Sequence, residues 1–210
     1  DPVNANVNGT ISANTTVWAQ EDITVQGNVT INSGITLTLL ADHLSATPGN
    51  WDDGSGAGVL GTGVIKDPGG NTITALSNTS ALIMYAGGGG IGTSANPILT
   101  SLNGASLTVI TNNPSQVGAA KTFIQNDGTG LKIAGITAAG GTNDNSVSIS
   151  SGGSITQTGA ISISGAASTG LELLGAGNYT LTNASNSVAI LAANLSGTGS
   201  LTYSNNSIYQ

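Results

Sequence analysis

Short apolar segments recur along the whole chain and are separated by corners rich in glycine, asparagine and serine. In "SVSISSGGSITQTGAISISG" (146–165), for example, Val147 and Ile149 bracket Ser148. In a β-strand such a triplet places two side chains on one face and one on the other. Glycine and asparagine between the segments tolerate the positive φ of tight corners. The pattern therefore predicts an all-β chain of very short strands, without long amphipathic helices.

The length of these segments favours one kind of all-β architecture. Most of them span three to five residues, whereas strands of a hairpin-built β-sandwich usually span about five or six. A corner after every short strand is typical of a parallel β-helix (β-solenoid), in which rungs of roughly twenty residues stack at ~4.8 Å. The apolar pair of each triplet would fill the interior. The alternative all-β fold is a β-sandwich.

The pattern divides the chain into three regions. Residues 1–40 contain N-terminal strands that form the first rungs, and the polar segment 1–16 is predicted to be an exchangeable arm. Residues 41–90 are less regular and are expected to form an insertion or a capping region. Residues 91–210 are the most regular and are expected to form stacked solenoid rungs.

Charge and the length of the apolar runs argue against two classes of function, nucleic-acid binding and membrane spanning. Charged residues make up 6% of the 210 residues, against about 25% in ordinary globular proteins. The chain has no arginine, three lysines and a net charge of −7. It therefore offers no basic face for nucleic acid. No apolar run approaches the ~20 residues of a membrane-spanning helix, so we expect no such segment.

Three stretches resemble a known group of proteins. "GGGGIGTSANPILTSLNGASLTVITNN" (87–113) and "GSITQTGAISISG" (153–165) resemble the repeats of filamentous haemagglutinin-type bacterial surface proteins. "DITVQGNVTINSGITLTL" (22–39) resembles the first rungs of many bacterial β-helix surface proteins. The resemblance implies a right-handed parallel β-helix, export across the cell envelope, and an adhesive or filament-building role. The motifs of the N-terminal secretion domain of that family are not found here, so the resemblance does not establish the secretion route.

One cluster of side chains is the candidate ligand-binding site. Trp51, Asp52 and Asp53 lie together in "NWDDGSGAG". An exposed tryptophan beside carboxylates could contact a glycan, and carboxylates on a glycine-rich loop could bind calcium. The structural alternatives are that Asp52 and Asp53 form a solvated turn and that Trp51 covers the end or side of the core. No other cofactor is expected.

Catalysis has less support in the sequence. Asp52, Asp53 and Asp67 are the only acidic residues close enough in sequence to suggest a paired-carboxylate glycosidase, and no arginine is present to hold a uronate substrate. His43 is the sole histidine, lies in "ADHLSATPG", and is expected to be a loop residue rather than a metal ligand or catalytic base. We therefore expect no catalytic residues and no enzyme activity.

These observations converge on a structural role outside the cell. The leading hypothesis is a secreted, extracellular or cell-surface protein of a bacterium, acting as an adhesin segment or as a self-assembling filament subunit. Exposed strand edges at the two ends of a solenoid would support self-association. The alternatives are a glycan-binding module that recognises a surface glycan and, less favoured, a polysaccharide-degrading β-helix enzyme.

Overall fold

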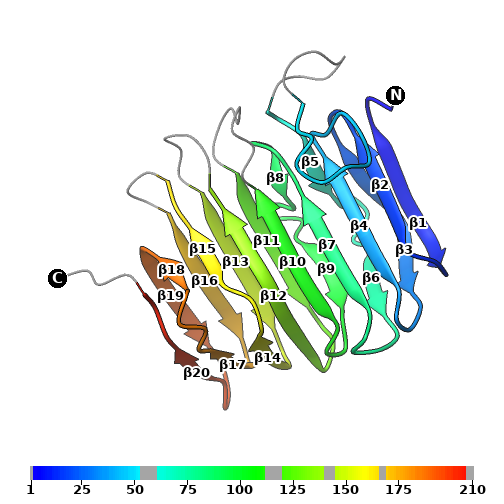
Figure 1. Cartoon of the computed structure of the whole chain (residues 1–210). Coiled ribbons are helices and arrows are strands. Elements are labelled where there is room, and N and C mark those ends of the chain that lie inside the picture. Colours follow the sequence, from blue (N-terminus) through cyan, green and yellow to red (C-terminus); the bar gives the residue numbers. More distant parts are fainter. Residues whose placement is uncertain (1, 53–60, 112–119, 140–144, 166–168, 207–210) are drawn as a thin grey trace.

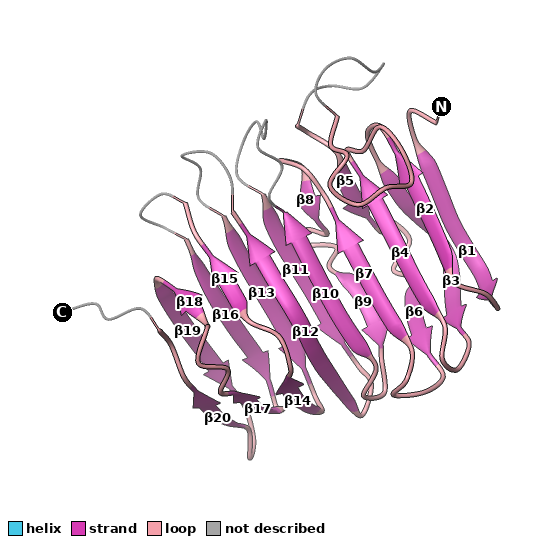
Figure 2. Cartoon of the chain, viewed as in Figure 1, coloured by secondary structure: helices cyan, strands magenta, loops and turns pink. Residues whose placement is uncertain are grey.

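The described part of the chain consists of strands and loops, with no helix (Figure 2). The computed structural model describes residues 2–52, 61–111, 120–139, 145–165 and 169–206. The predicted all-β class is therefore confirmed for these residues. They form two ten-stranded sheets that lie face to face (Figure 1).

The chain passes back and forth between the two sheets, and four of its passages contribute two consecutive strands to the same sheet, for example β5 and β6. Sheet A contains β1 (Ala5–Ile11), β3 (Ile23–Ile31), β5 (Val64–Lys66), β6 (Thr72–Ala75), β8 (Gly90–Ile91), β9 (Ile98–Ser101), β11 (Lys121–Asn126), β13 (Ser146–Ser151), β16 (Gly170–Gly175) and β19 (Ile190–Leu195). Sheet B contains β2 (Thr15–Ala19), β4 (Thr36–Ala41), β7 (Ala81–Tyr85), β10 (Ser106–Thr111), β12 (Gly130–Ala138), β14 (Ser154–Gln157), β15 (Ile161–Ile163), β17 (Asn178–Leu181), β18 (Ser187–Val188) and β20 (Ser200–Tyr203).

Every ladder between these strands is parallel. The described residues thus contain no antiparallel hairpin ladder, and the alternative of a hairpin-built sandwich is not found. Neighbouring strands of one sheet come from successive passages of the chain through sheet A and sheet B. We call the residues of one such passage a layer, so that each layer adds to both sheets. This arrangement is consistent with a β-solenoid.

The layer length varies around the roughly twenty residues that the sequence pattern predicted. Near the two ends of the stack, in-register partners lie 18 to 22 positions apart, as for Ala5–Ile23 and Gly170–Ile190. Residues hydrogen-bonded between neighbouring central layers lie 24 to 26 positions apart, as for Ser148–Glu172 and Thr100–Asn126. The expected rung length therefore fits the end layers and is too short for the central ones.

The alternating pattern does set which side chains face inward. Val147 and Ile149 on β13 are 1% and 0% exposed, whereas Ser148 between them is partly exposed. The register places Ile149 beside Ile124 on β11 and Leu173 on β16, and both partners are also buried. Stacked aliphatic side chains therefore continue from layer to layer. Complete burial of such a side chain contributes about 1.5–3 kcal/mol.

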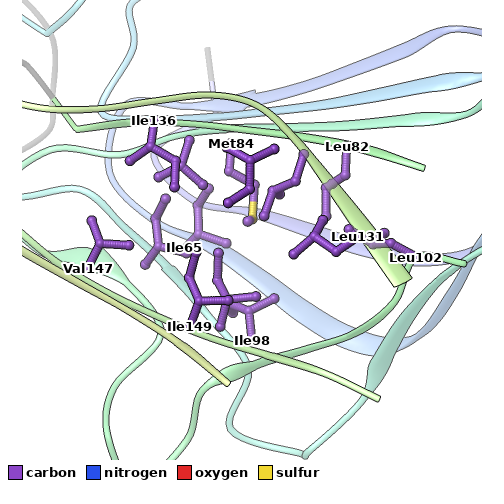
Figure 3. Packing of buried hydrophobic residues seen from close by; sticks show 14 of the residues in the cluster. Ile65, Leu82, Met84, Ile98, Leu102, Leu131, Ile136, Val147 and Ile149 are labelled. Atoms are coloured by element: carbon purple, nitrogen blue, oxygen red, sulfur yellow. The ribbon is translucent and has the colours of Figure 1, made fainter. Parts of the chain in front are cut away.

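The core lies between the two sheets (Figure 3). Ile98 and Ile149 from sheet A point toward Leu82, Met84 and Leu131 from sheet B. All five side chains are at most 1% exposed. One contiguous apolar cluster extends from Val7 near one end of the stack to Val188 near the other. The chain has no cysteine, so this packing and the ladders hold the layers together without disulfides.

Asparagine side chains connect layers at the corners. The amide of buried Asn126 accepts a hydrogen bond from Leu102 N at 3.0 Å, and that of Asn145 accepts one from Ala120 N at 3.2 Å. Such bonds satisfy backbone donors where the strand ladder is interrupted. Few corner asparagines adopt the positive φ that the sequence pattern suggested for them. Among the described residues, Asn103 is the only asparagine with positive φ, and Asp42 is the only other non-glycine residue with it.

The three sequence regions occupy successive parts of the stack. Within the predicted arm 1–16, β1 pairs with β3 of the same chain. The irregular region 41–90 includes a long connection between β4 and β5, but also β5, β6 and β7, which belong to the sheets. The described parts of region 91–210 continue both sheets from β9 to β20.

Candidate functional site

The predicted site follows β4, where the chain leaves sheet B. His43 and Trp51 form an antiparallel bridge, and Asp52 N donates a hydrogen bond to Asp42 O at 2.9 Å. Asn50 N donates a hydrogen bond to Thr47 O at 3.1 Å, which closes the turn that joins His43 to Trp51. The described segment 42–52 is therefore a short hairpin-like loop, which we call the His43–Trp51 loop.

His43 anchors this loop from the inside. Its side chain is fully buried, Nδ1 lies 2.9 Å from Ala41 O, and Nε2 accepts a hydrogen bond from Gly49 N at 3.3 Å. A ring that accepts at Nε2 and donates at Nδ1 is the neutral imidazole. Burial lowers the pKa of His43, and the bond to Ala41 opposes this effect. The prediction that His43 is a loop residue holds, but it is an interior residue of that loop.

Three rings meet at this loop. The His43 and Trp51 ring centroids lie 4.2 Å apart, and Tyr85 at the end of β7 meets His43 edge-on at 5.5 Å. Trp51 and Tyr85 are both partly exposed. The register sets Tyr85 beside Leu40 of β4, which is completely buried although strand alternation places it on the outer face of sheet B. We attribute that burial to the His43–Trp51 loop.

Glycines make room for the start of the loop. Asp42 is fully buried and has a φ of 66°. A Cβ added at Gly87 would collide with the Asp42 carboxylate, and one added at Gly63 would lie 2.6 Å from Asp42 Cβ. The glycine run that begins at Gly87 therefore has a local packing role beside this carboxylate.

The carboxylates of the predicted site are distributed differently from the expectation of a solvated turn. Asp52 is 0% exposed, whereas Asp53 lies outside the described residues. Asp67 lies in the turn between β5 and β6 on sheet A, where its Oδ1 accepts hydrogen bonds from Gly69 N at 3.2 Å and Asn71 Nδ2 at 2.9 Å. Asp67 thus stabilises its own turn.

The described residues of the predicted site differ in their exposure. Among the described residues, no group of three or more His, Cys, Asp or Glu side chains is arranged to hold a metal ion. Of the two described members of the predicted trio, Trp51 is partly exposed and Asp52 is buried. The sequence did not indicate that His43 and Tyr85 would contact Trp51. The spacing of His43 and Trp51 around the "TPGN" turn is the one signal that could have suggested their pairing.

Comparison with known proteins finds no matching family model, curated protein or solved structure. Within the part of the chain that the structure describes, no helix has the length and apolar character needed to cross a membrane.

Proposed function

We propose that this chain is a rigid segment of a secreted bacterial surface protein, acting as an adhesin segment or as a subunit of a surface filament. The observation that carries the proposal is the continuous core between two parallel sheets, with uncharged serine and threonine side chains at outward positions of strands such as β6 and β13. A stack held by hydrogen bonds along one axis resists bending. It would space adhesive surfaces away from a cell without needing a large globular domain.

The proposed architecture is a closed, right-handed β-solenoid. Its support is the regular alternation of the chain between sheets A and B, with one parallel layer added at each passage. Connections between parallel strands of one sheet are right-handed in nearly all proteins. Layers that run from β1 to β19 in sheet A correspond to a stack height on the order of 35 Å at ordinary strand spacing.

The end of the stack at β19 supports a repeating or self-associating assembly. Leu191 on β19 is 37% exposed, although its in-register partner Leu171 on β16 is 1% exposed. A further layer placed against β19, from a longer chain or from a second copy, would cover this side chain. Among the described residues β19 is the last strand of sheet A, and its outer edge offers the backbone groups that such a layer needs.

The proposed role is non-enzymatic and requires no cofactor. Its supports are the burial of Asp52, the engagement of Asp67 in a turn, and the absence of arginine from the sequence. Low charge and abundant hydroxyl groups suit repeated weak contacts between a rod and a surface, which gain strength when many act together.

The location can be tested on intact cells of the source organism. An antibody raised against the purified chain should label the outside of unpermeabilised cells, as seen by immunogold electron microscopy. Labelling that requires permeabilisation would contradict the proposal.

The two forms of the proposal can be separated with the purified chain. Fibres in negative-stain micrographs would favour a filament subunit, and separate short particles an adhesin segment. If fibres form, deletion of residues 1–16 should abolish them, because β1 would be the strand that exchanges between copies. Unchanged fibres after this deletion would rule out the predicted arm.

A further inference from the structure

A second surface, unrelated to Trp51, lies on the outer face of sheet A. The outward side chains of β13 are all serines: Ser146, Ser148 and Ser150. β13 runs between β11 and β16 (Figure 1). Two adjoining depressions of about 220 and 260 Å³ lie over these strands and share Phe123, Ser148 and Glu172. We call this surface the serine trench.

The depth of the serine trench follows from side-chain size. The register aligns Phe123 of β11, Ser148 of β13 and Glu172 of β16 in one row across the sheet. Because neighbouring strands lie about 4.8 Å apart, β11 and β16 are separated by about 10 Å. Short serines between larger side chains leave the middle strand recessed. Six residues of β13 give the trench a length of about 20 Å.

The trench combines an aromatic wall with oriented polar groups. Phe123 is partly exposed and borders both depressions. On the opposite wall, Ser148 Oγ donates a hydrogen bond to Glu172 Oε2 at 2.7 Å, which holds the carboxylate over the floor. Gln125 and Ser150 add an amide and a hydroxyl farther along. A ring face, hydroxyls, an amide and a carboxylate side by side suit a ligand with both C–H faces and hydroxyl groups.

The same features disfavour other classes of partner. The β13 backbone is hydrogen-bonded to β11 and β16, so an added peptide strand has no backbone partner on this face. The exposed large hydrophobic residues in the described part of the chain are Val3, Leu76, Ile190 and Leu191, and of these only Ile190 borders the trench. The apolar area that a hydrophobic interface between copies could use here is therefore small and consists mainly of Phe123, Leu174 and Ile190. Glu172 and a net charge of −7 oppose an anionic polysaccharide.

We propose that the serine trench binds a neutral linear glycan, with Phe123 packed against a sugar ring and Glu172, Ser150 and Gln125 bonding to sugar hydroxyls. This inference goes beyond the proposed rod function, because the trench would bind a glycan wherever the chain is located. It also assigns glycan binding to a different surface from the predicted trio Trp51, Asp52 and Asp53.

Nuclear magnetic resonance of the ¹⁵N-labelled chain can test this proposal directly. The probes are cellohexaose and chitohexaose as neutral oligosaccharides, and hexagalacturonate as the anionic comparison. At least one neutral hexamer should shift the amide signals of residues 121–126, 146–151 and 170–175, with a Kd on the order of 1 mM or lower. Hexagalacturonate should bind at least tenfold more weakly than that hexamer.

Variants distinguish the trench from the Trp51 surface. Phe123→Leu, which keeps an apolar side chain without the aromatic face, should weaken binding at least tenfold, and Glu172→Gln should weaken it to a smaller extent. Trp51→Ala and Ile83→Ala, the latter on the outward face of β7, should leave the affinity unchanged. The spectrum of each free variant shows whether the fold is retained.

Several results would overturn the proposal. These are the absence of shifts with either neutral hexamer at about 10 mM, shifts centred on Trp51 instead of β13, and full affinity in Phe123→Leu. Trench signals that depend on protein concentration without added glycan would identify the surface as a contact between copies instead. None of these outcomes depends on where the chain resides, so failure of the trench and failure of the surface-rod proposal are separable.

Discussion

The Nε2 atom of His43 accepts a hydrogen bond from the backbone N–H of Gly49 at 3.3 Å, inside a loop that is closed by Trp51. Protonation of the ring would place an N–H at Nε2, where it would face the Gly49 N–H donor. Burial already lowers the pKa of His43 in the folded chain. Asp42 and Asp52 are titratable groups of the same loop, and Tyr85 of β7 contacts the His43 ring.

These relationships predict that the chain loses stability as the pH falls below about 6.5. In that range the unfolded chain binds a proton at His43 that the folded chain does not bind, so the free energy of unfolding decreases with decreasing pH. The loss should level off once the pH is below the lowered pKa. Urea unfolding between about pH 7.5 and 5.5 measures this dependence.

The control for this prediction is His43→Gln, which retains an acceptor but does not titrate in this range. The variant should be less stable than the parent chain at neutral pH and should show a weaker pH dependence between the same limits. An identical pH dependence in both proteins would show that other groups are responsible.

A second prediction concerns the buried asparagines. The Asn186 side chain accepts a hydrogen bond from Ile161 N at 2.9 Å and donates to Leu181 O at 3.2 Å and Ser204 O at 2.9 Å. Asn186→Ala leaves buried backbone groups without these partners and should lower the free energy of unfolding by at least about 2 kcal/mol. Asn178 on β17 also links two layers, since it accepts a hydrogen bond from Ser200 Oγ at 2.9 Å, but this bond is exposed and water can replace it. Asn178→Ala should therefore change the free energy of unfolding by less than about 0.5 kcal/mol. Equal losses in equilibrium unfolding would contradict the layer-bridging role.

A third prediction concerns the break between β14 and β15. Gly159 lies against the middle of β12, and an added Cβ would collide with the backbone of Ala134. Gly159→Ala should therefore destabilise the chain by about 1–3 kcal/mol. The matched variant is Gly152→Ala, whose Cβ would meet nothing within 4 Å and should have an effect below about 0.5 kcal/mol. Thermal unfolding of both variants checks the difference, and a tolerated Gly159→Ala would mean that the two layers are not in close contact.

The local sequence pattern predicts the inward faces but not the connections. Val147 and Ile149 are buried as their alternation with serine indicates, because period two is a local property of a strand. The layer length depends on where each strand meets its neighbour, which no single segment specifies. Likewise, the bond of Asn126 to Leu102, 24 residues away, depends on the register between layers.

The local sequence pattern also does not predict the contacts that form the candidate sites. The pattern drew attention to Trp51 and Asp52, but the burial of Asp52 and the contact of Trp51 with Tyr85 depend on how the His43–Trp51 loop folds back onto sheet B. Phe123 is an aromatic residue next to Ile124, a composition typical of the interior, yet it points outward, because Thr122 and Ile124 on either side of it occupy the buried positions of β11. The serine trench is composed of residues from several layers, chiefly those of β11, β13 and β16, so no contiguous motif marks it.

Disulfide formation between paired cysteines is the most direct measurement of the parallel stack. Ser150 of β13 and Leu174 of β16 lie in register on the outer face of sheet A, and Asn194 of β19 lies one layer beyond. Adjacent strands are separated by about 4.8 Å, within the Cα distance that a disulfide bridges, whereas two layers span about 10 Å. The chain has no native cysteine to interfere. In dilute solution under mild oxidation, we predict rapid intramolecular bonding in the Ser150→Cys/Leu174→Cys variant and none in Ser150→Cys/Asn194→Cys. Failure of the first pair, or equal bonding in both, would contradict the stacked parallel architecture.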